Sequence, residues 1–231
     1  AGSAKLNGAV AVLTDQVGAA LVTDMPVIIV ANPRAAAGVV SAWLHNEPMR
    51  DMFSVAVTGT NGKTTVTTLL HQIAMAASRQ SGLVGTVETR IGDEVVAALR
   101  TTPEAPELQS LAAVMRERHM RNLIMEVSSH AVSLNRIGGA HFDIAAFTNL
   151  SQDHLDFHGD MDSYFAAKAA LFTHKYADSA YINIDSAWSK KLLEIQELPV
   201  TKISRSVKSA DWYFERIETG VHSTVIAIRG T

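Results

Sequence analysis

The order of hydrophobic and polar residues along the chain predicts strands and helices in alternation. Short apolar and β-branched runs predict strands, and apolar residues recurring every three or four positions predict amphipathic helices. Strands are expected at residues 8–14, 26–31, 53–57, 82–90, 94–99, 122–127, 142–147, 180–184, 200–204, 211–218 and 221–228. Helices are expected at residues 33–45, 64–77, 101–119, 160–172 and 187–195.

This alternation indicates an α/β fold. Strands separated by helices over about 130 residues favour a mostly parallel sheet with helices on both faces. Two hairpins interrupt the pattern, one turning at Gly92-Asp93 and the other at Thr219-Gly220. In parallel sheets, functional residues collect at the carboxyl ends of the strands. Polar residues that follow a predicted strand are therefore the first candidates for a site.

The segment Asn46-Glu47-Pro48 interrupts the pattern after the first predicted helix, and we place a domain boundary near residue 50. Residues 1–50 are predicted to be the incomplete end of a small α/β domain, because about fifty residues make a thin core. They hold two predicted buried strands and a helix with Asn32 as N-cap and Pro33 at its first position. Residues 51–231 are predicted to form the main domain.

Composition narrows the classes of protein to consider. Of the 231 residues, 47% are hydrophobic, the net charge is −3, and there is no cysteine. A chain without a dense basic stretch is not expected to bind nucleic acid. The lack of cysteine excludes disulfides and thiolate metal sites and fits a reducing cytoplasm. The apolar runs are too short to span a bilayer, so we expect a cytoplasmic protein without membrane association.

The strongest motif is residues 53–68, FSVAVTGTNGKTTVTT. A buried strand, a glycine turn and Gly62-Lys63-Thr64 opening a helix are typical of a phosphate-binding loop. Lys63 would reach the β- and γ-phosphates, and the Thr64 hydroxyl would hold Mg²⁺. The common pattern has a glycine five residues before Gly62, where this chain has Val57. A plain strand-to-helix turn is the alternative interpretation, but the surrounding strand and helix favour nucleotide binding.

Polar residues also follow two further predicted strands. Glu126 lies near the end of one and precedes Ser128-Ser129-His130, while Asn149 follows the next strand, just before residues 151–158, SQDHLDFH. Carboxylate oxygens and imidazole nitrogens can complete the coordination of Mg²⁺. The same residue types are also zinc ligands, and a polar loop of turns and helix caps is a third interpretation. A nucleotide loop in the same domain favours Mg²⁺.

Two other positions have ordinary local explanations. Lys168 lies on an alanine-rich predicted helix, where spacing alone predicts a solvent-exposed side chain. Residues 101–104, TTPE, are typical of a helix start with proline at the first helical position and an acid in the first turn. The residues by themselves therefore predict a Mg²⁺-dependent, ATP-binding α/β domain and leave the acceptor unidentified.

Five motifs together resemble a known family. TGTNGKTT, TTPEAP, MEVSSHA, FTNLSQDHLDFHG and YFAAKAALF occur in this order. They resemble the central domain of the Mur ligases, which build the peptide of bacterial peptidoglycan and whose shortened phosphate loop accounts for Val57. The resemblance extends from about residue 8 to at least residue 185. Folylpolyglutamate synthetases share the loop and the general fold, but not the combination of MEVSSHA with DHLDFHG.

The resemblance implies roles for individual residues. ATP would be contacted by Thr58, Gly59, Thr60, Asn61, Gly62, Lys63, Thr64, Asn149 and Asn183. The acceptor would be contacted by Thr101, Thr102, Ser128 and Arg136. Mg²⁺ would be held by Thr64, Glu126, His154 and Lys168, and catalysis would be carried by Lys63, Lys168, Glu126 and His154.

Lys168 matches the family lysine that becomes carbamylated, which reverses the prediction of a surface side chain. A carbamate is an anion that could hold Mg²⁺, and it forms only from a neutral amine, so the pKa of this lysine should be lowered by its surroundings. One departure from the family is Leu134, because some members carry a polar residue at that position.

The resemblance also implies ATP-driven amide formation through an acyl phosphate. The motifs are most similar to those of the ligases that add the third amino acid, diaminopimelate or lysine, to UDP-N-acetylmuramoyl-L-alanyl-D-glutamate, and diaminopimelate is the commoner case. Residues 1–50 would be the remnant of the family's N-terminal UDP-binding domain, and no C-terminal amino-acid-binding domain is found. We therefore expect a monomeric fragment that is inactive alone. An ATP-binding module without ligase activity and a folylpolyglutamate-type ligase are the alternatives.

Overall fold

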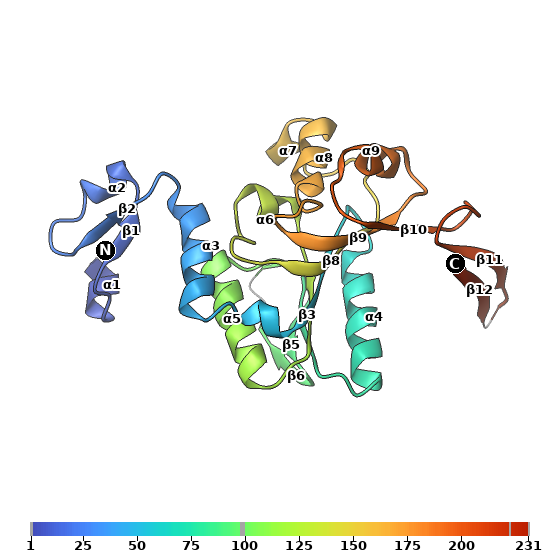
Figure 1. Ribbon diagram of the computed structural model, residues 1–231, viewed down its shortest axis with the longest axis horizontal. Coiled ribbons are helices and arrows are strands. Elements are labelled where there is room, and N and C mark those ends of the chain that lie inside the picture. Colours follow the sequence, from blue (N-terminus) through green and yellow to red (C-terminus); the bar gives the residue numbers. More distant parts are fainter. Residues whose placement is uncertain (1, 98–99, 222, 231) are drawn as a thin grey trace.

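The computed structural model describes residues 2–97, 100–221 and 223–230. The strands of its main sheet are β3 (Phe53–Thr58), β4 (Ser81–Val84), β5 (Thr89–Ile91), β6 (Glu94–Val96), β7 (Asn122–Glu126), β8 (Phe142–Phe147), β9 (Ala177–Asn183), β10 (Val200–Ser204), β11 (Trp212–Thr219) and β12 (Thr224–Gly230). Within the described residues, they follow the order β12-β11-β10-β9-β8-β3-β7-β4-β5-β6 (Figure 1). Pairing is parallel from β4 to β11 and antiparallel for β5, β6 and β12 at the edges. The predicted α/β fold with a mostly parallel sheet is confirmed.

Helices cover both faces of this sheet. They are α4 (Lys63–Ala76), α5 (Ala105–Glu117), α6 (Ser129–Ser133), α7 (Leu155–His158), α8 (Met161–Ala169) and α9 (Ala187–Ile195). Successive residues of a strand point to opposite faces, so Val57 of β3 packs with Val66 on the α4 side, whereas Ala56 belongs to the larger core that includes Leu108 of α5. Figure 1 shows α4 and α5 on opposite sides of the strands. No helix in the described ranges is long and apolar enough to cross a membrane.

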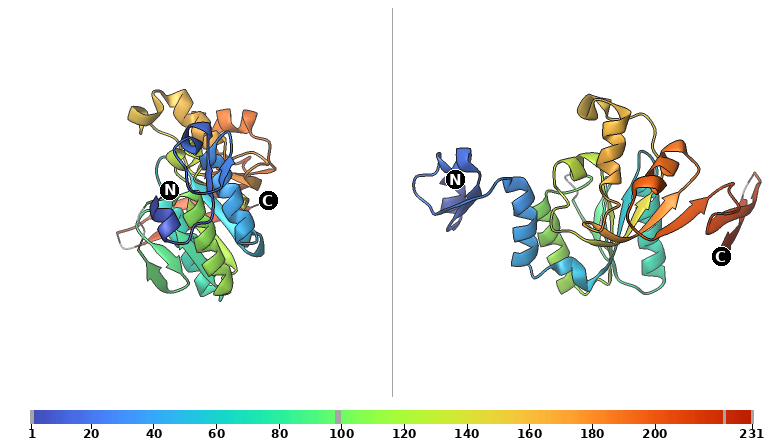
Figure 2. Two further views of the ribbon diagram at one scale, coloured as in Figure 1. Left: turned by 90° about the vertical axis from the view of Figure 1, so that its left-hand side faces the viewer. Right: turned by 45° about the horizontal axis from the view of Figure 1, so that its top comes forward.

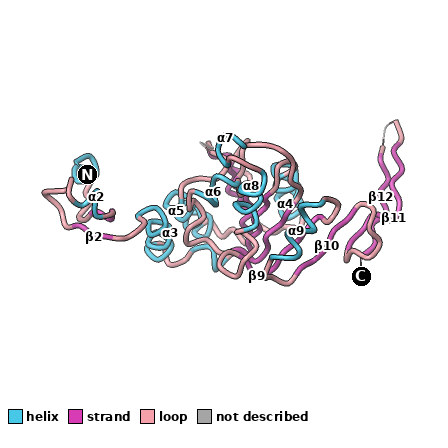
Figure 3. The backbone as a smooth tube through the Cα atoms, turned by 90° about the horizontal axis from the view of Figure 1, so that it is seen from above, coloured by secondary structure: helices cyan, strands magenta, loops and turns pink. Residues whose placement is uncertain are grey.

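The N-terminal residues form a small unit at one end of the molecule, opposite the β11–β12 hairpin (Figures 2 and 3). It consists of α1 (Gly2–Leu6), β1 (Val12–Thr14), α2 (Gln16–Ala19) and β2 (Val27–Ile29), with the two strands paired in parallel. The prediction that its strands are buried is wrong, because Ile28 and Ile29 are more than half exposed. A two-stranded sheet has few neighbours to cover its faces.

Helix α3 (Pro33–Leu44) joins this unit to the main sheet. As predicted, Asn32 caps it, with its side chain accepting a hydrogen bond from the Ala35 N–H, and Pro33 takes the first helical position. The helix packs against α5, and a β-carbon added at Gly38 would lie 2.4 Å from the Gly138 oxygen. The two backbones therefore meet where only glycine fits. The 3₁₀ helix η1 (Pro48–Asp51) follows, and the domain boundary near residue 50 stays a prediction.

One predicted strand is divided into two in the structure. Residues 82–90 were predicted as one strand but belong to two, β4 and β5, because the chain turns where the Gly85 N–H donates to the Glu88 oxygen at 3.1 Å. The hairpin predicted at Gly92-Asp93 is confirmed by the antiparallel pairing of β5 with β6.

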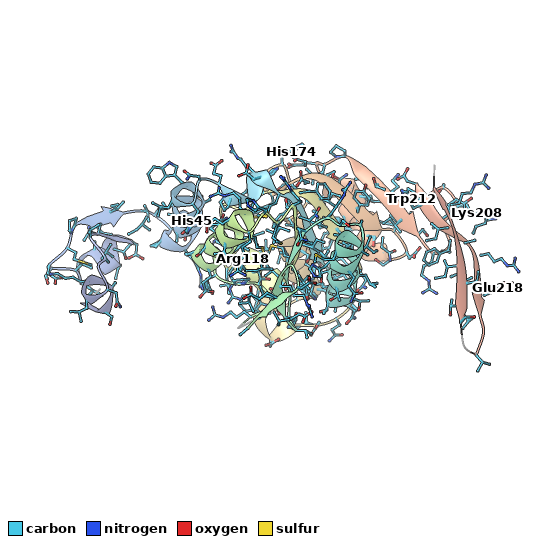
Figure 4. The ribbon with its side chains drawn as sticks, turned by 90° about the horizontal axis from the view of Figure 1, so that it is seen from below. His45, Arg118, His174, Lys208, Trp212 and Glu218 are labelled. Carbon is cyan, nitrogen blue, oxygen red and sulfur yellow. The ribbon has the colours of Figure 1, made fainter. Side chains whose placement is uncertain are left out.

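The C-terminal hairpin turns slightly later than predicted. The Gly220 N–H donates to the Ser223 oxygen at 2.7 Å, so β12 begins at Thr224 and not at Val221. Figure 4 labels Trp212 and Glu218 on β11, where this hairpin extends away from the main body. The predictions for Leu99 and His222 fall outside the described residues.

Candidate nucleotide and acceptor site

The candidate site lies at the carboxyl ends of three neighbouring strands. In the sheet register, Val57 of β3 pairs with Glu126 of β7, and Thr58 pairs with Phe147 of β8. The phosphate loop, residues 58–64, follows β3 directly. The parallel pairing therefore brings the loop, Glu126 and the segment after β8 together, as the sequence predicted.

The phosphate loop is fastened to the segment that follows β8. The Asn149 side chain accepts a hydrogen bond from the Asn61 N–H at 3.0 Å and donates one to the Asn61 oxygen at 3.0 Å. Gly59 has a φ of +144°, and a β-carbon there would lie 2.0 Å from the Thr148 hydroxyl oxygen. Glycine at this position thus permits both the backbone conformation and the close approach.

Lys63 opens α4 and folds back over the loop. Its Nζ atom donates to the backbone oxygens of Gly59 at 3.0 Å and Thr60 at 2.9 Å. Burial lowers the pKa of Lys63, and the nearby carboxylates of Glu126 and Asp153 oppose that shift. The backbone N–H groups at the start of α4 form an N-terminus that favours anions. The arrangement is able to hold phosphate oxygens.

Glu126 is a buried carboxylate surrounded by hydroxyl groups. It accepts hydrogen bonds from the Thr64 hydroxyl at 3.1 Å, the Thr86 N–H at 2.8 Å and the Thr86 hydroxyl at 3.0 Å. The side chain is 1% exposed. Thr86 was not among the predicted site residues, although it follows the end of β4 as the other candidates follow their strands. The prediction of one long strand over residues 82–90 concealed that strand end.

The donor atoms at Glu126 suit Mg²⁺ better than zinc. Thr64 and Glu126 supply oxygen ligands, and Mg²⁺ is commonly bound by one or two carboxylates together with substrate phosphates and waters. A zinc site takes at least three protein ligands. Among the residues that the structure describes, no group of three or more His, Asp or Glu side chains is close enough to hold a metal ion. The zinc interpretation therefore has no support in the geometry.

Lys168 is buried, so the exposure predicted from its spacing is wrong. The side chain is 1% exposed, and Nζ donates to the Gly59 oxygen at 2.9 Å. It also lies 4.7 Å from the ring centre of Tyr164, one turn earlier on α8. Burial and, to a smaller extent, the nearby charge of Lys63 together lower the pKa of Lys168 to about 7. The helix face that carries Lys168 is turned toward the phosphate loop and not toward solvent.

Aromatic and imidazole rings surround this lysine. His154, with φ at +52°, lies with its ring centre 4.9 Å from that of His130 and 6.1 Å from that of Tyr164. His158 contacts Tyr164 at 5.1 Å between ring centres and lies 2.9 Å from the Ser129 hydroxyl. His154 is therefore near the Lys168 helix, as expected. The predicted site residues did not include Tyr164, His130 or His158. Tyr164 could have been found, because it lies four residues before Lys168, the spacing of neighbours on one helix face.

The predicted acceptor residues lie on the other side of Glu126. The Thr102 hydroxyl donates to the Glu126 backbone oxygen at 2.9 Å and accepts from the Ser128 N–H at 3.3 Å. The hydroxyl oxygens of Thr101 and Thr86 lie 3.1 Å apart, within hydrogen-bond distance. Arg136 lies 2.9 Å from Glu104. The structure thus brings these predicted positions to one edge of the site.

The start of α5 was predicted wrongly. The helix begins at Ala105 with Glu104 as its N-cap, and not with Pro103 at the first helical position. A capping box closes it, because the backbone N–H of Glu104 donates to the Glu107 carboxylate. Thr102 is buried and bound to β7, which keeps residues 101–103 out of the helix.

Asn183 was predicted to contact ATP, but it lies apart from the other residues predicted to do so. It ends β9, which pairs with β8 and not with β3. Its side chain accepts a hydrogen bond from the Asp185 N–H at 3.0 Å. In the described part of the chain, Asn183 makes no hydrogen bond to the phosphate loop.

Comparisons with known proteins agree with this geometry. The chain is 45% identical over 226 residues to the UDP-N-acetylmuramoyl-L-alanyl-D-glutamate–2,6-diaminopimelate ligase of Streptomyces avermitilis, covering 96% of this chain and 44% of that protein. A solved structure of a ligase with the same name has a TM-score of 0.82 at 25% identity and matches 99% of this chain and 47% of its own.

A Mycobacterium tuberculosis folylpolyglutamate synthase complexed with ADP and AMPPCP has a TM-score of 0.65 at 16% identity, over 85% of this chain and 52% of that one. That likeness shows a shared fold alone. The chain spans less than half the length of the S. avermitilis relative. Residues 57–230 match the Mur ligase middle domain, which is most of the chain, and the chain therefore belongs to the Mur ligase family.

Proposed function

We propose that the protein is an ATP-dependent amide ligase that adds the third amino acid to UDP-N-acetylmuramoyl-L-alanyl-D-glutamate. The observation that carries the proposal is Lys168, buried against Gly59 of the phosphate loop. A module that only binds nucleotide has no need to bury a second lysine there. The name of the S. avermitilis relative supports the acceptor and diaminopimelate as the amino acid.

The phosphate loop and its fastening residues would bind ATP. The backbone N–H groups at the start of α4 face the phosphates, Lys63 moves from the Gly59 oxygen to the β- and γ-phosphates, and Asn149 keeps the loop in position. Thr64, Glu126 and His154 would hold Mg²⁺. Mg²⁺ would supply charge stabilisation on the phosphoryl group being transferred.

Lys168 would act as a carbamate. Its amine attacks carbon dioxide, forming a nitrogen–carbon bond and releasing one proton, and this requires the neutral amine. A pKa of about 7 makes a large neutral fraction accessible at physiological pH. The product is an anion at a buried position beside the loop, where it would serve as a further ligand to Mg²⁺.

Thr101, Thr102, Ser128 and Arg136 would orient the acceptor so that its terminal carboxylate faces the γ-phosphate. A carboxylate oxygen would attack the γ-phosphorus of ATP, which forms the acyl phosphate and releases ADP. The amine of the incoming amino acid then displaces phosphate, and Lys63 stabilises the negative charge that develops. We expect the full-length protein to act as a monomer in the bacterial cytoplasm, without nucleic acid or membrane partners.

The test is a ligation assay with the full-length protein. ATP, Mg²⁺ and UDP-N-acetylmuramoyl-L-alanyl-D-glutamate are supplied with either diaminopimelate or lysine, and formation of the UDP-muramoyl tripeptide is followed. We expect product with diaminopimelate. ATP binding without product for either amino acid would contradict the proposal and favour a nucleotide-binding module; activity on a folate instead would favour the folylpolyglutamate-type alternative.

A further inference from the structure

Three arginine side chains from distant parts of the chain meet at one carboxylate. Glu104 lies 2.8 Å from Nη2 of Arg34, 3.1 Å from Nη1 of Arg100 and 2.9 Å from Nε of Arg136. Arg34 is near the start of α3, Arg100 precedes the residues 101–102 of the acceptor edge, and Arg136 follows α6. The fold has thus gathered three cations that the sequence separates.

Glu104 does not neutralise this cluster. One carboxylate balances one of three positive charges, and the carboxylate of Glu107, which accepts a hydrogen bond from the backbone N–H of Glu104, adds one more negative charge. With both acids counted, the group stays positive by one. Burial by itself would raise the pKa of the Glu104 carboxyl, but the hydrogen bond from Arg34 and the charges of Arg136 and Arg100 outweigh it and lower the pKa. Glu104 is therefore held as an anion.

The guanidinium groups also have more N–H donors than Glu104 has acceptors. Each guanidinium carries five donors, whereas a carboxylate accepts about four hydrogen bonds. The buried Nε of Arg136 is close to Glu104 yet has no aligned hydrogen bond. Arg34 and Arg100 are each half exposed, so donors on both remain accessible to a ligand.

The cluster borders the acceptor edge of the site. Thr102 lies between Arg100 and Glu104 in the chain, and its hydroxyl donates to the Glu126 backbone oxygen at 2.9 Å. An anionic group bound to the arginines would therefore lie near Thr102 and the carboxyl end of β7, where the Glu126 carboxylate accepts from Thr64 of the phosphate loop.

We propose that Arg34, Arg100 and Arg136 form one subsite for an oxyanion of the acceptor, a carboxylate or a phosphate, and that Glu104 is the positioning residue that gathers them. This inference rests on the proposed function and extends its acceptor contacts from Arg136 to Arg34 and Arg100. Glu104 keeps three like charges together before the ligand arrives. The oxyanion then uses the N–H donors that Glu104 leaves free.

The experiment measures binding of UDP-N-acetylmuramoyl-L-alanyl-D-glutamate by calorimetry, with AMPPCP and Mg²⁺ present. Arg100→Met removes the charge but keeps an apolar stem, and we expect the affinity to fall at least about tenfold. Arg118→Met is the matched control, because Arg118 (labelled in Figure 4) is equally exposed but pairs with Glu94 at the far end of α5. It should leave the affinity unchanged, and no variant should alter AMPPCP binding.

The role of Glu104 is tested separately. Glu104→Gln should weaken binding of the same ligand, and Glu104→Asp, which restores the charge, should recover part of the loss. An effect of Glu104→Gln on thermal unfolding alone, with acceptor affinity intact, would overturn the positioning role. If Glu104→Gln does not fold, Arg100→Met still decides the subsite.

A second ligand identifies the oxyanion. UDP-N-acetylmuramoyl-L-alaninol keeps the diphosphate but carries no carboxylate. A loss on Arg100→Met for both ligands assigns the diphosphate, and a loss for the dipeptide ligand alone assigns a glutamyl carboxylate; either supports the subsite. Equal affinity of the unaltered protein and Arg100→Met for both ligands would overturn it while leaving the proposed function intact. Failure of the unaltered full-length protein to bind either ligand or AMPPCP would contradict the proposed function itself.

Discussion

Lys168 donates a hydrogen bond of 2.9 Å from its buried Nζ atom to the backbone oxygen of Gly59. The same oxygen accepts a hydrogen bond of 3.0 Å from Lys63. Two lysines therefore converge on one atom of the phosphate loop, and their mutual repulsion adds to the burial that lowers the pKa of Lys168. If phosphates draw Lys63 away as proposed, Lys168 would still donate to the Gly59 oxygen.

The stability of the protein should depend on pH through Lys168. Its folded-state pKa of about 7 lies below the ordinary value of 10.5, so the unfolded chain binds more protons between these two values. The free energy of unfolding should therefore rise with pH across that window, by at most about 1.4 kcal/mol per pH unit. Below pH 7 the lysine is charged in both states, and the contribution no longer changes.

Urea unfolding in buffers free of carbon dioxide, from pH 6 to pH 10.5, measures this dependence. Lys168→Met is the comparison, since it fills similar space without a titrating group. The free energy of unfolding of the unaltered protein, relative to that of Lys168→Met, should rise as the pH rises from 7 to 10.5. A difference that is constant with pH would mean that Lys168 keeps an ordinary pKa in the folded protein.

Removing the Tyr164 hydroxyl should weaken nucleotide binding. The Thr60 hydroxyl donates its one proton to the Ser151 oxygen, so Tyr164 is the donor in the 3.2 Å contact between the two hydroxyls. Tyr164→Phe removes one of the two hydrogen bonds that the Thr60 hydroxyl oxygen accepts, the other coming from the Ser151 N–H at 3.0 Å. AMPPCP affinity should fall about fivefold, equivalent to roughly 1 kcal/mol. Calorimetry checks this.

Tyr181→Phe is the control for that loss. Tyr181 lies on β9, and its hydroxyl has no hydrogen-bond partner among the described residues. Its AMPPCP affinity should match that of the unaltered protein. Equal affinity of Tyr164→Phe and Tyr181→Phe would show that the Tyr164 hydroxyl does not position the loop.

Two glycines of the phosphate loop separate crowding from backbone strain. Both have positive φ, but a β-carbon at Gly59 would meet the Thr148 hydroxyl at 2.0 Å, whereas one at Gly62 has open space around it. Gly62→Ala should cost about 1–2 kcal/mol of stability through strain alone. Gly59→Ala should cost more and also abolish AMPPCP binding, because the loop must move. Denaturant unfolding measures the stability of both variants, and calorimetry measures their affinity for AMPPCP. Equal losses of stability and affinity in the two variants would contradict the crowding at Gly59.

The residues that sequence could locate are those whose role follows from position after a strand. Val57 pairs with Glu126 on one side and with Ala146 on the other. The loop after β3, the carboxylate at the end of β7 and the segment after β8 therefore had to meet once the strands were recognised as parallel. Local pattern was sufficient because the geometry of parallel strands does the rest.

Other features depend on tertiary contacts that no local pattern reports. The alanines around Lys168 predict a surface residue, and only the packing of α8 against the phosphate loop buries its side chain. The helix start at residue 101 was misplaced because Thr102 is held by β7 and not by α5. The arginines around Glu104 come from positions 34, 100 and 136, so their meeting cannot be deduced without the fold.

The central claim is that Lys168, as a carbamate, completes the catalytic site of a ligase. The most direct measurement is ATP-dependent ligation of diaminopimelate to UDP-N-acetylmuramoyl-L-alanyl-D-glutamate by the full-length Lys168→Ala variant, with and without a short-chain carboxylate in solution. We predict that the substitution abolishes product formation and that the added carboxylate restores part of it by occupying the vacated position. Full activity of Lys168→Ala without any added carboxylate would contradict the account.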